Sequence, residues 1–241
     1  MIPWKQRMEM QLSEPHAPGV LTLGELSRAA SLARREPVPD PTLHAWIRDA
    51  IARNRLAPVI RGIYLNRFIH PAGRLADAAA HVRRDAVVSL HSALDEAGML
   101  NNPPAGVTAV LPLDSGPTRP RVGRVRTSAG AIQFHAMPRA ILEAGEIEDR
   151  LDLGRGPAHA RATPEKALLD WLYLAKSPRS ALAPPALHDV EHDALNKRRL
   201  MRLARAMKLE DTLAQWLRGE FTQKKSGVHR PVQRSSPVPR R

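Results

Sequence analysis

The chain of 241 residues contains no cysteine, and this absence removes several classes of protein. Without thiols there is no disulfide scaffold, no zinc finger with cysteine ligands and no cysteine nucleophile. Aromatic residues make up only 4% of the chain, whereas hydrophobic residues as a whole make up 43%. Leu, Ala, Val and Ile must therefore build the core, and the length predicts one or two domains.

Long apolar runs are also missing. No run approaches the ~20 residues that a membrane-spanning helix needs. The first 16 residues hold no apolar stretch of the length found in a signal peptide. We therefore expect a cytoplasmic protein with no membrane partner.

Acidic residues are scarce relative to basic ones: 24 Asp and Glu stand against 37 Lys and Arg, which gives a net charge of +13. Such an excess favours a polyanionic partner, with nucleic acid first and an anionic membrane surface second. Residues 20–74 carry +5 of this charge, and residues 223–241 carry +6 with no acid. The segment 223–241 cannot bury apolar surface, so we expect a disordered basic tail.

Helical periodicity marks the N-terminal part of the chain. Apolar residues at spacings of four predict a helix over residues 4–12. Thr22 and Glu25 have the spacing of a capping box, which predicts a helix over residues 22–32. After a proline-rich gap, Asp40 as N-cap and Pro41 in the first turn predict a second helix. The apolar stripe of that second helix consists of Leu43, Trp46, Ile47, Ala50 and Ile51.

Two short strands are expected around the tight turn Arg61-Gly62. The order helix, helix, β-ribbon in a basic segment resembles a winged helix-turn-helix. In such a unit the second helix enters the major groove of double-stranded DNA and the ribbon lies against phosphates. The groove-facing residues would be Thr42, His44, Ala45 and Arg48, and the phosphate contacts would be Arg34, Arg35, Arg55 and Arg61. The alternative is a small helical domain with an ordinary solvated basic face.

The segment between these two helices is longer than the turn of a standard helix-turn-helix, which has about 3–4 residues. It reads ARREPVP over residues 33–39. Either it is a looped insertion, or the first helix continues through Arg35. The path of this segment decides which residues enter the groove.

The second half of the chain predicts a mixed domain. A short Ala-rich helix (74–82) precedes a strand (86–88), a helix capped by Ser89 that ends at Gly98, a buried strand (106–113) and two strands around 128–130. Thr163 and Pro164 then begin an amphipathic helix, and residues 186–218 supply one or two more. The fold class is therefore α+β: a winged helix-turn-helix over 1–75, a mixed α/β domain over 76–222 and the tail over 223–241.

Groups with catalytic potential lie too close together in the sequence to form a site. A nucleophilic triad needs members that converge from different elements, but Ser89, His91, Ser92 and Asp95 share one short predicted helix. We expect these side chains to cap the helix or face solvent. The sequence Pro164-Glu165-Lys166 hints at nuclease chemistry, but no partner acid stands at a useful spacing, and the helix dipole explains an acid in the first turn. No catalytic residue is predicted.

The histidines predict no metal site. His81, His91 and His135 are scattered, and His188 and His192 stand four apart without the HExxH order of zinc proteases. We expect the last two on a solvated helix face. The chain also lacks a Gly-rich phosphate loop, so no metal and no cofactor are predicted.

Three segments together resemble the AbiEi-type antitoxins. RGIYLNRF (61–68) is similar to their wing signature RGxY, AVVSLHSALDEAGML (86–100) to hxSxxSALxxxGL, and ATPEKALLDWLYL (162–174) to xPEKALLDLL. The resemblance spans about residues 19–180, and the proline-rich insertion and the basic tail depart from it. The matching residues are Arg61, Gly62 and Tyr64; Ser89, Ser92, Ala93 and Leu94; and Pro164, Glu165, Lys166, Ala167, Leu168, Leu169 and Asp170.

This resemblance implies an antitoxin from the toxin–antitoxin operon of an abortive-infection system. Such proteins repress their own operon by binding repeated elements in its promoter. The cognate toxin is a nucleotidyltransferase-like protein, and its neutralisation need not involve a direct complex. The last two matching sets would be structural, and no enzymatic activity is expected.

Two other functions stay open. One is a stand-alone winged-helix transcription factor with a ligand- or protein-sensing C-terminal domain, which an open apolar pocket in that domain would favour. The other is a nuclease or another nucleic-acid-modifying enzyme, which metal-dependent DNA cleavage would reveal.

Overall fold

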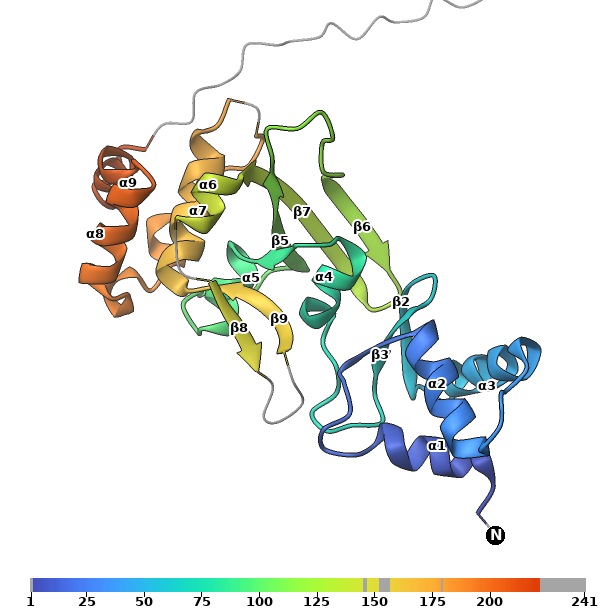
Figure 1. Cartoon of the computed structure of the whole chain (residues 1–241). Helices are drawn as coiled ribbons and strands as arrows, with labels where there is room; N and C mark the ends of the chain where they lie inside the picture. The colour runs from blue at the N-terminus through green and yellow to red at the C-terminus, as the bar shows by residue number, and fades with distance from the viewer. Residues whose placement is uncertain (1, 145–146, 152–156, 179, 222–241) are drawn as a thin grey trace, which may run out of the picture.

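The computed structural model describes residues 2–144, 147–151, 157–178 and 180–221, and shows a mixed α+β protein with two β-sheets (Figure 1). The predicted disordered tail, 223–241, lies outside the described residues. None of the helices in the described ranges is long and apolar enough to cross a membrane.

The N-terminal part contains three helices and a three-stranded antiparallel sheet of order β1-β3-β2. Its two predicted helices, the hairpin and the first short helix are confirmed, whereas β1 was not predicted. The elements are α1 (Trp4–Leu12), β1 (Val20–Thr22), α2 (Leu23–Arg34), α3 (Asp40–Ala52), β2 (Leu56–Ile60) and β3 (Ile63–Asn66).

The predicted capping box begins α2. The backbone N–H of Thr22 donates to Glu25 Oε2 at 2.7 Å, and the N–H of Glu25 donates to Thr22 Oγ1 at 3.2 Å. The helix ends at Arg34, and Arg35 adopts the left-handed conformation with φ 68°. Of the two alternatives for residues 33–39, the structure is nearer to a first helix that continues through Arg35, since α2 ends one residue earlier. A turn then leads to α3, and Val38 is buried in this turn.

The predicted role of Asp40 as N-cap is wrong. Asp40 is the first residue of α3, Pro39 precedes it, and no side chain caps the helix by a hydrogen bond. The carboxylate of Asp40 instead lies in the first turn, where the helix dipole favours a negative charge.

The central sheet has six strands in the order β6-β7-β5-β4-β9-β8. β5 pairs in parallel with β7 and β4 with β9, and the other neighbours are antiparallel. The predicted strands are confirmed, whereas β8 and β9 were not predicted. The strands are β4 (Val87–Val88), β5 (Val107–Leu113), β6 (Gly123–Thr127), β7 (Gly130–Pro138), β8 (Ile147–Leu151) and β9 (Pro157–Ala162).

Short helices surround this sheet, and the predicted Ala-rich helix is a 3-10 turn followed by one α-helical turn. They are η1 (Leu75–Ala78), α4 (Ala79–Val82), α5 (His91–Glu96), α6 (Arg139–Glu143), α7 (Pro164–Lys176), η2 (Leu187–Asp189), η3 (His192–Ala194), α8 (Lys197–Ala206) and α9 (Glu210–Leu217). Thr163 caps α7 as predicted, by accepting from the N–H of Lys166.

The two faces of the central sheet belong to different cores, because side chains alternate along a strand. Val110 and Met137 pack with the residues of α5 and α7 in one core. Ala109 and Phe134, on the opposite face, pack in a second core that also contains Val20 and Leu65 of the N-terminal sheet. The N-terminal part and the central sheet therefore share a hydrophobic core.

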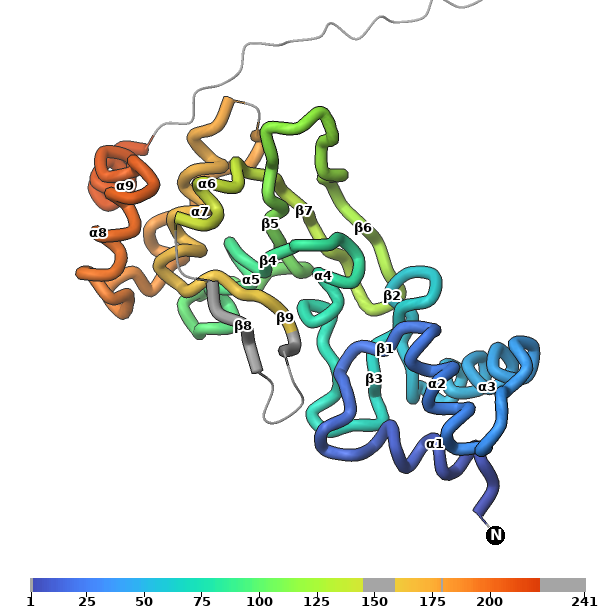
Figure 2. The backbone as a smooth tube through the Cα atoms, in the orientation of Figure 1, coloured from blue at the N-terminus to red at the C-terminus, as the bar shows by residue number. Residues whose placement is uncertain are grey.

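A hydrogen bond reinforces this junction, and a close backbone contact lies within the N-terminal part. Ser128, in the β6–β7 turn, donates its hydroxyl to the carbonyl oxygen of Pro58 in β2 at 2.6 Å. The backbone trace in Figure 2 shows the β2–β3 hairpin beside the end of β6. Gly73 lies so close to Gly19 that a Cβ on Gly73 would stand 1.9 Å from the Gly19 carbonyl oxygen. Only glycine fits at position 73.

Candidate functional site

Helix α3 separates its residues onto two faces. Leu43, Trp46 and Ile47 are buried, and the Trp46 ring stacks on Phe68 with centroids 6.2 Å apart and an interplanar angle of 7°. Asp49 is exposed on the other side of the helix, together with all four side chains that were predicted to face DNA: Thr42, His44, Ala45 and Arg48. The helix lies at the edge of the molecule farthest from α8 and α9 (Figure 1).

Predicted phosphate-binding residues flank both ends of α3. Arg34 is half-buried and forms an ion pair with Glu36 at 2.6 Å, whereas Arg35 is exposed in the turn before the helix. Arg55 follows the helix, and its guanidinium carbon lies 5.8 Å from the centroid of the Phe68 ring. The fold thus places basic groups on either side of the exposed α3 face.

Arg61 lies apart from Arg55, because β2 separates them. At about 3.3 Å per residue, their Cα atoms are roughly 20 Å apart. Gly62 has φ +79° at this turn and accepts a hydrogen bond from the N–H of Leu23 at 2.8 Å. The central sheet contacts the same hairpin through Ser128. Arg61 is exposed, but it can reach only phosphates different from those near Arg55.

Two further arginines near α3 were not predicted as site residues. Arg28 is exposed on α2 and, with Arg35, lines a hollow of about 550 Å³ beside Leu32. Its position two helical turns before Arg35 could have identified it. Arg53 differs, because Glu9 and Asp49 bind its guanidinium at 2.8 and 2.7 Å. The hydrogen bond with Glu9 is the main reason that the pKa of Arg53 is raised, and these acids already neutralise its charge.

A buried polar cluster joins α7 to the start of α5. Ser89 donates its hydroxyl to Asp170 Oδ2 at 2.7 Å, and Lys166 Nζ donates to Asp170 Oδ1. All three residues are fully buried. Burial raises the pKa of Asp170, and the contacts with Lys166 and Ser89 oppose that effect. Because this cluster has no exposed surface, it connects elements of the core and offers no access to a substrate.

The structure corrects three predictions for residues in or near this cluster: Ser89, Ser92 and Glu165. Ser89 does not cap α5, since Leu90 precedes the helix and no side chain caps it. Ser92 does not face solvent: it is buried and accepts a hydrogen bond from the N–H of Thr108 at 2.8 Å. The acid that Lys166 contacts is Asp170, four residues on in the same helix. Glu165 is also buried and accepts from the N–H of Asn196 at 2.9 Å, which is more than a contact with the helix dipole.

The prediction of a helix face with His188 and His192 is also wrong. The two residues belong to separate 3-10 turns, η2 and η3, so helical spacing does not apply to them. Within the described ranges, no group of three His, Asp or Glu residues could hold a metal ion.

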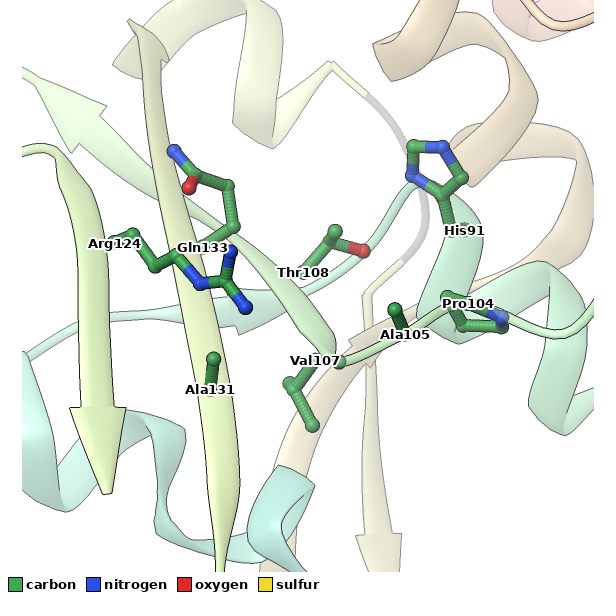
Figure 3. A pocket seen from close by; sticks show the side chains of 9 residues that line it. His91, Pro104, Ala105, Val107, Thr108, Arg124, Ala131 and Gln133 are labelled. Carbon is green, nitrogen blue, oxygen red and sulfur yellow. The ribbon is translucent and has the colours of Figure 1, made fainter.

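A row of polar side chains crosses three strands of the central sheet. In the strand register, Thr108 of β5 stands opposite Gln133 of β7, which stands opposite Arg124 of β6. They line a hollow of about 240 Å³ together with His91. Figure 3 shows the Arg124 guanidinium lying across β7 towards Val107, with Gln133 beside it.

His91 lines this hollow, and His135 lines the adjoining cavity that shares His91 with it. The ring of His91 lies 3.7 Å from that of Trp171, centroid to centroid. Burial, with the nearby His135, lowers the pKa of His91 to about 4, and burial also lowers the pKa of His135. His91 Nδ1 and His135 Nε2 are buried and have no hydrogen-bond partner in the described structure. No local pattern in the sequence associates these residues, because His91 belongs to α5 and His135 to β7.

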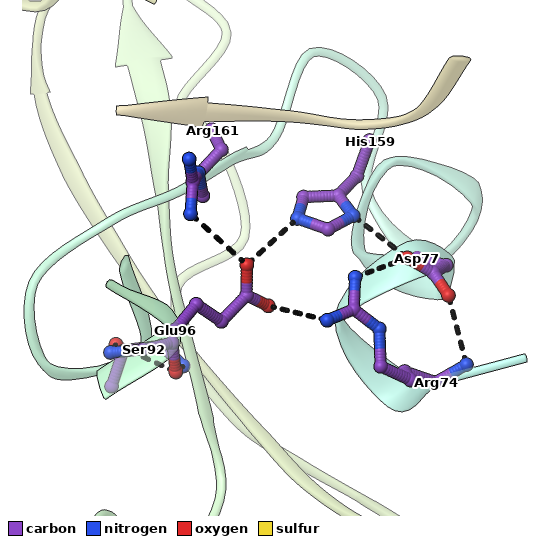
Figure 4. Close-up of polar contacts among 7 residues, drawn as sticks. Arg74, Asp77, Ser92, Glu96, His159 and Arg161 are labelled. Atoms are coloured by element: carbon purple, nitrogen blue, oxygen red, sulfur yellow. Dashed lines mark hydrogen bonds and ion pairs between the residues drawn. The ribbon is translucent and has the colours of Figure 1, made fainter. Parts of the chain in front are cut away.

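A second polar network lies between η1, α5 and β9 (Figure 4). His159 Nδ1 and Asp77 Oδ1 are 2.8 Å apart, and His159 Nε2 lies 3.6 Å from Glu96. Arg74 and Arg161 also contact Glu96, at 3.6 and 3.7 Å. Burial lowers the pKa of His159, but the contacts with Asp77 and Glu96 outweigh it and the net pKa is raised.

Comparison with known proteins shows a likeness in fold to a solved structure. No protein-family model matches the chain, and no match to a curated protein was found. The structure is similar to the crystal structure of the RV2827C protein from Mycobacterium tuberculosis. The TM-score is 0.52 at 20% sequence identity, and the match covers 88% of this chain and 78% of that one.

The extent of this match bears on the organisation of the chain. Neither the N-terminal part nor the central part alone amounts to 88% of the residues. The likeness to the mycobacterial protein therefore includes both parts. At 20% identity it shows a shared fold and carries no function.

Proposed function

We propose that this protein is an AbiEi-type antitoxin that represses its own operon by binding promoter DNA through a winged helix-turn-helix over residues 1–75. The observation that supports it best is the exposed face of α3, which presents Thr42, His44, Ala45 and Arg48 away from the core. Short polar and arginine side chains of this kind can reach base edges in the major groove.

The arrangement of elements around α3 agrees with this proposal. The helix is the last one before the β2–β3 hairpin, and β1 completes the sheet on the far side of β3. A recognition helix followed by a wing has this order. Arg35 at one end of α3 and Arg55 at the other are spaced to contact phosphates, which position a protein without reading sequence.

The antitoxin assignment rests on the three resembling segments. Two of them meet in the buried cluster, where Ser89 of the second segment binds Asp170 of the third. Their matching polar residues thus have a structural use in the core. The functional partner would be a nucleotidyltransferase-like toxin, whose neutralisation need not require contact, and the protein itself would have no enzymatic activity.

An alternative is a stand-alone winged-helix transcription factor with a ligand-sensing central domain. The hollow between β5, β7 and β6 favours this alternative, because it is open and its lining combines apolar side chains with His91, whose Nδ1 has no partner in the described structure. The third possibility, a nuclease, has less support. Glu165 and Lys166, the carboxylate and lysine that hinted at it, are both buried, and Lys166 is bound to Asp170.

DNA binding is tested with fluorescence anisotropy on the full chain, using duplexes from its own promoter and random duplexes over a salt series. Arg48→Ala should weaken promoter binding by about 1–3 kcal/mol and reduce discrimination between the two duplexes. Arg61→Ala should weaken binding to both and lower the salt slope by about 1. Arg126→Ala, an exposed arginine of β6, is the control and should change neither. Equal losses on both duplexes for Arg48→Ala and Arg61→Ala would contradict these roles.

The toxin relationship needs a separate experiment. Expression of a neighbouring nucleotidyltransferase gene should arrest growth, and coexpression of this chain should restore it. The Arg48→Ala variant separates the two activities, since it should lose repression of a promoter reporter. Failure of the wild-type chain to restore growth, with repression intact, would leave the transcription factor as the better assignment.

A further inference from the structure

The hollow over the central sheet continues into a second, larger one. Cavities of about 240 and 530 Å³ share His91, Thr108 and Gln133 in their linings. We call the two together the sheet pocket. Its size is that of a site for a small organic molecule, which typically occupies about 300–1,000 Å³.

The charge of the sheet pocket is one-sided. Arg124 contributes a guanidinium, and neither cavity has Asp or Glu in its lining. Within the described ranges Arg124 makes no ion pair, although most arginines of the N-terminal part that flank α3 do meet an acid or a ring. A guanidinium offers paired N–H donors that match the oxygens of a carboxylate or a phosphate.

Other polar groups of the sheet pocket also lack hydrogen-bond partners within the described part of the protein. The side-chain amide of Gln133 forms no hydrogen bond in the described structure, and His91 Nδ1 and His135 Nε2 are buried without partners. Buried polar atoms in proteins nearly always have a partner. The two buried histidine nitrogens, from α5 and β7, lie beside the exposed guanidinium of Arg124 and the half-buried amide of Gln133, and together they indicate a place where a ligand supplies the missing bonds.

The larger cavity has a different character. Val122, Leu174 and Leu182 contribute apolar walls to it. The sheet pocket therefore has a cationic, hydrogen-bonding end at Arg124 and Gln133 and a more apolar end near α7. An organic molecule with one charged end matches that division.

We propose that the sheet pocket binds a small organic oxyanion, with its phosphate or carboxylate group on Arg124 and Gln133 and its organic body against Leu174 and Leu182. The two histidines hydrogen-bond the ligand between these ends. This site is independent of the proposed DNA-binding face on α3, so that either can fail without the other.

The test uses isothermal titration calorimetry on the full chain with four probes: inorganic phosphate, adenosine monophosphate, benzoate and uncharged adenosine. Binding of adenosine monophosphate identifies a phosphate, and binding of benzoate a carboxylate. Arg124→Gln should weaken that binding about tenfold or more, since it removes the charge-assisted pair. Arg126→Gln is the matched control: it lies on the same strand and face, is exposed, and is outside the lining, so its affinity should stay within about threefold.

A second measurement locates the ligand. The imidazole resonances of His91 and His135 in NMR spectra should shift on addition of the probe, and those of exposed His188 should not. The proposal is overturned if neither organic anion binds at about 10 mM (weaker than about −3 kcal/mol), if adenosine binds as well as its monophosphate, or if both arginine variants lose affinity equally. Whatever the result with the ligands, the Arg124→Gln variant should bind promoter DNA as the wild type does, since Arg124 lies outside the proposed DNA-binding face.

Discussion

The hydroxyl of Ser89 donates a hydrogen bond to Asp170 across 81 positions of the sequence, at 2.7 Å. The same carboxylate accepts from Lys166, and none of the three residues is exposed. Each polar group is thus satisfied by another, as buried groups must be. Two segments that resemble antitoxin motifs therefore meet at one contact, which attaches α7 to the edge of α5.

Lys166→Met should destabilise the protein by about 3–5 kcal/mol, because it leaves the Asp170 carboxyl buried without its cation. Ser89→Ala should have a smaller effect, about 1–3 kcal/mol. Urea unfolding followed by circular dichroism measures both. The double variant Lys166→Met/Asp170→Leu removes both charges and should recover much of the loss. An unchanged midpoint for Lys166→Met would mean that the pair contributes nothing.

Gly73→Ala should destabilise the protein by about 2–3 kcal/mol through overpacking. A Cβ at this position would stand 1.9 Å from the Gly19 carbonyl oxygen, so the two segments of the N-terminal part that meet at Gly19 and Gly73 must shift apart. Gly116→Ala is the matched control, since a Cβ there meets no atom within 4 Å. Thermal unfolding compares the two variants. Similar melting temperatures would show that the backbone around Gly19 and Gly73 rearranges at little cost in stability.

The stability of the protein should fall as the pH decreases from 6.5 towards 4, in part because of His91. Burial and His135 lower its pKa in the folded state to about 4, below the ordinary value of 6.5. Over that interval the unfolded chain binds a proton that the folded chain does not, so acid favours unfolding. His91→Leu should flatten this part of the profile of urea midpoint against pH. His188→Leu, at an exposed position, is the control and should leave the profile unchanged.

His159 should act on the other side of pH 6.5. Burial lowers its pKa, but Asp77 and Glu96 raise it by more, so the folded value exceeds 6.5. Its stabilising contribution is complete below 6.5 and is lost as the pH rises through the folded pKa. His159→Gln should reduce stability at pH 6 by about 1–3 kcal/mol and by less at pH 9. A loss of equal size at both pH values would contradict a charged His159.

Local signals in the sequence predicted most of the elements but few of the long-range contacts. The capping box at Thr22 and the stripe around Trp46 depend on neighbours within one or two turns, so they could be read directly. The pairing of β4 with β9 joins residues 73 positions apart, at Val88 and Arg161, and nothing local specifies it.

The candidate sites follow the same division. The exposed face of α3 was predictable because helical periodicity determines it. The sheet pocket was not, since strand register aligns Arg124 with Gln133 and the packing of α5 adds His91, and neither is specified locally. The prediction for Ser89 was wrong because its position before a helix is typical of an N-cap. In the folded protein its hydroxyl instead donates a hydrogen bond to Asp170.

The core shared by Val20, Leu65 and Phe134 has a consequence for how two copies could occupy repeated DNA elements. A recognition helix on a flexible linker tolerates variable spacing between DNA repeats, because the linker can adopt different end-to-end distances. Here α3 is joined to the body of the molecule through packed side chains and not through a linker. If it reads DNA, neighbouring copies that touch would accept repeats at one separation, and inserting half a helical turn between them would abolish joint occupancy.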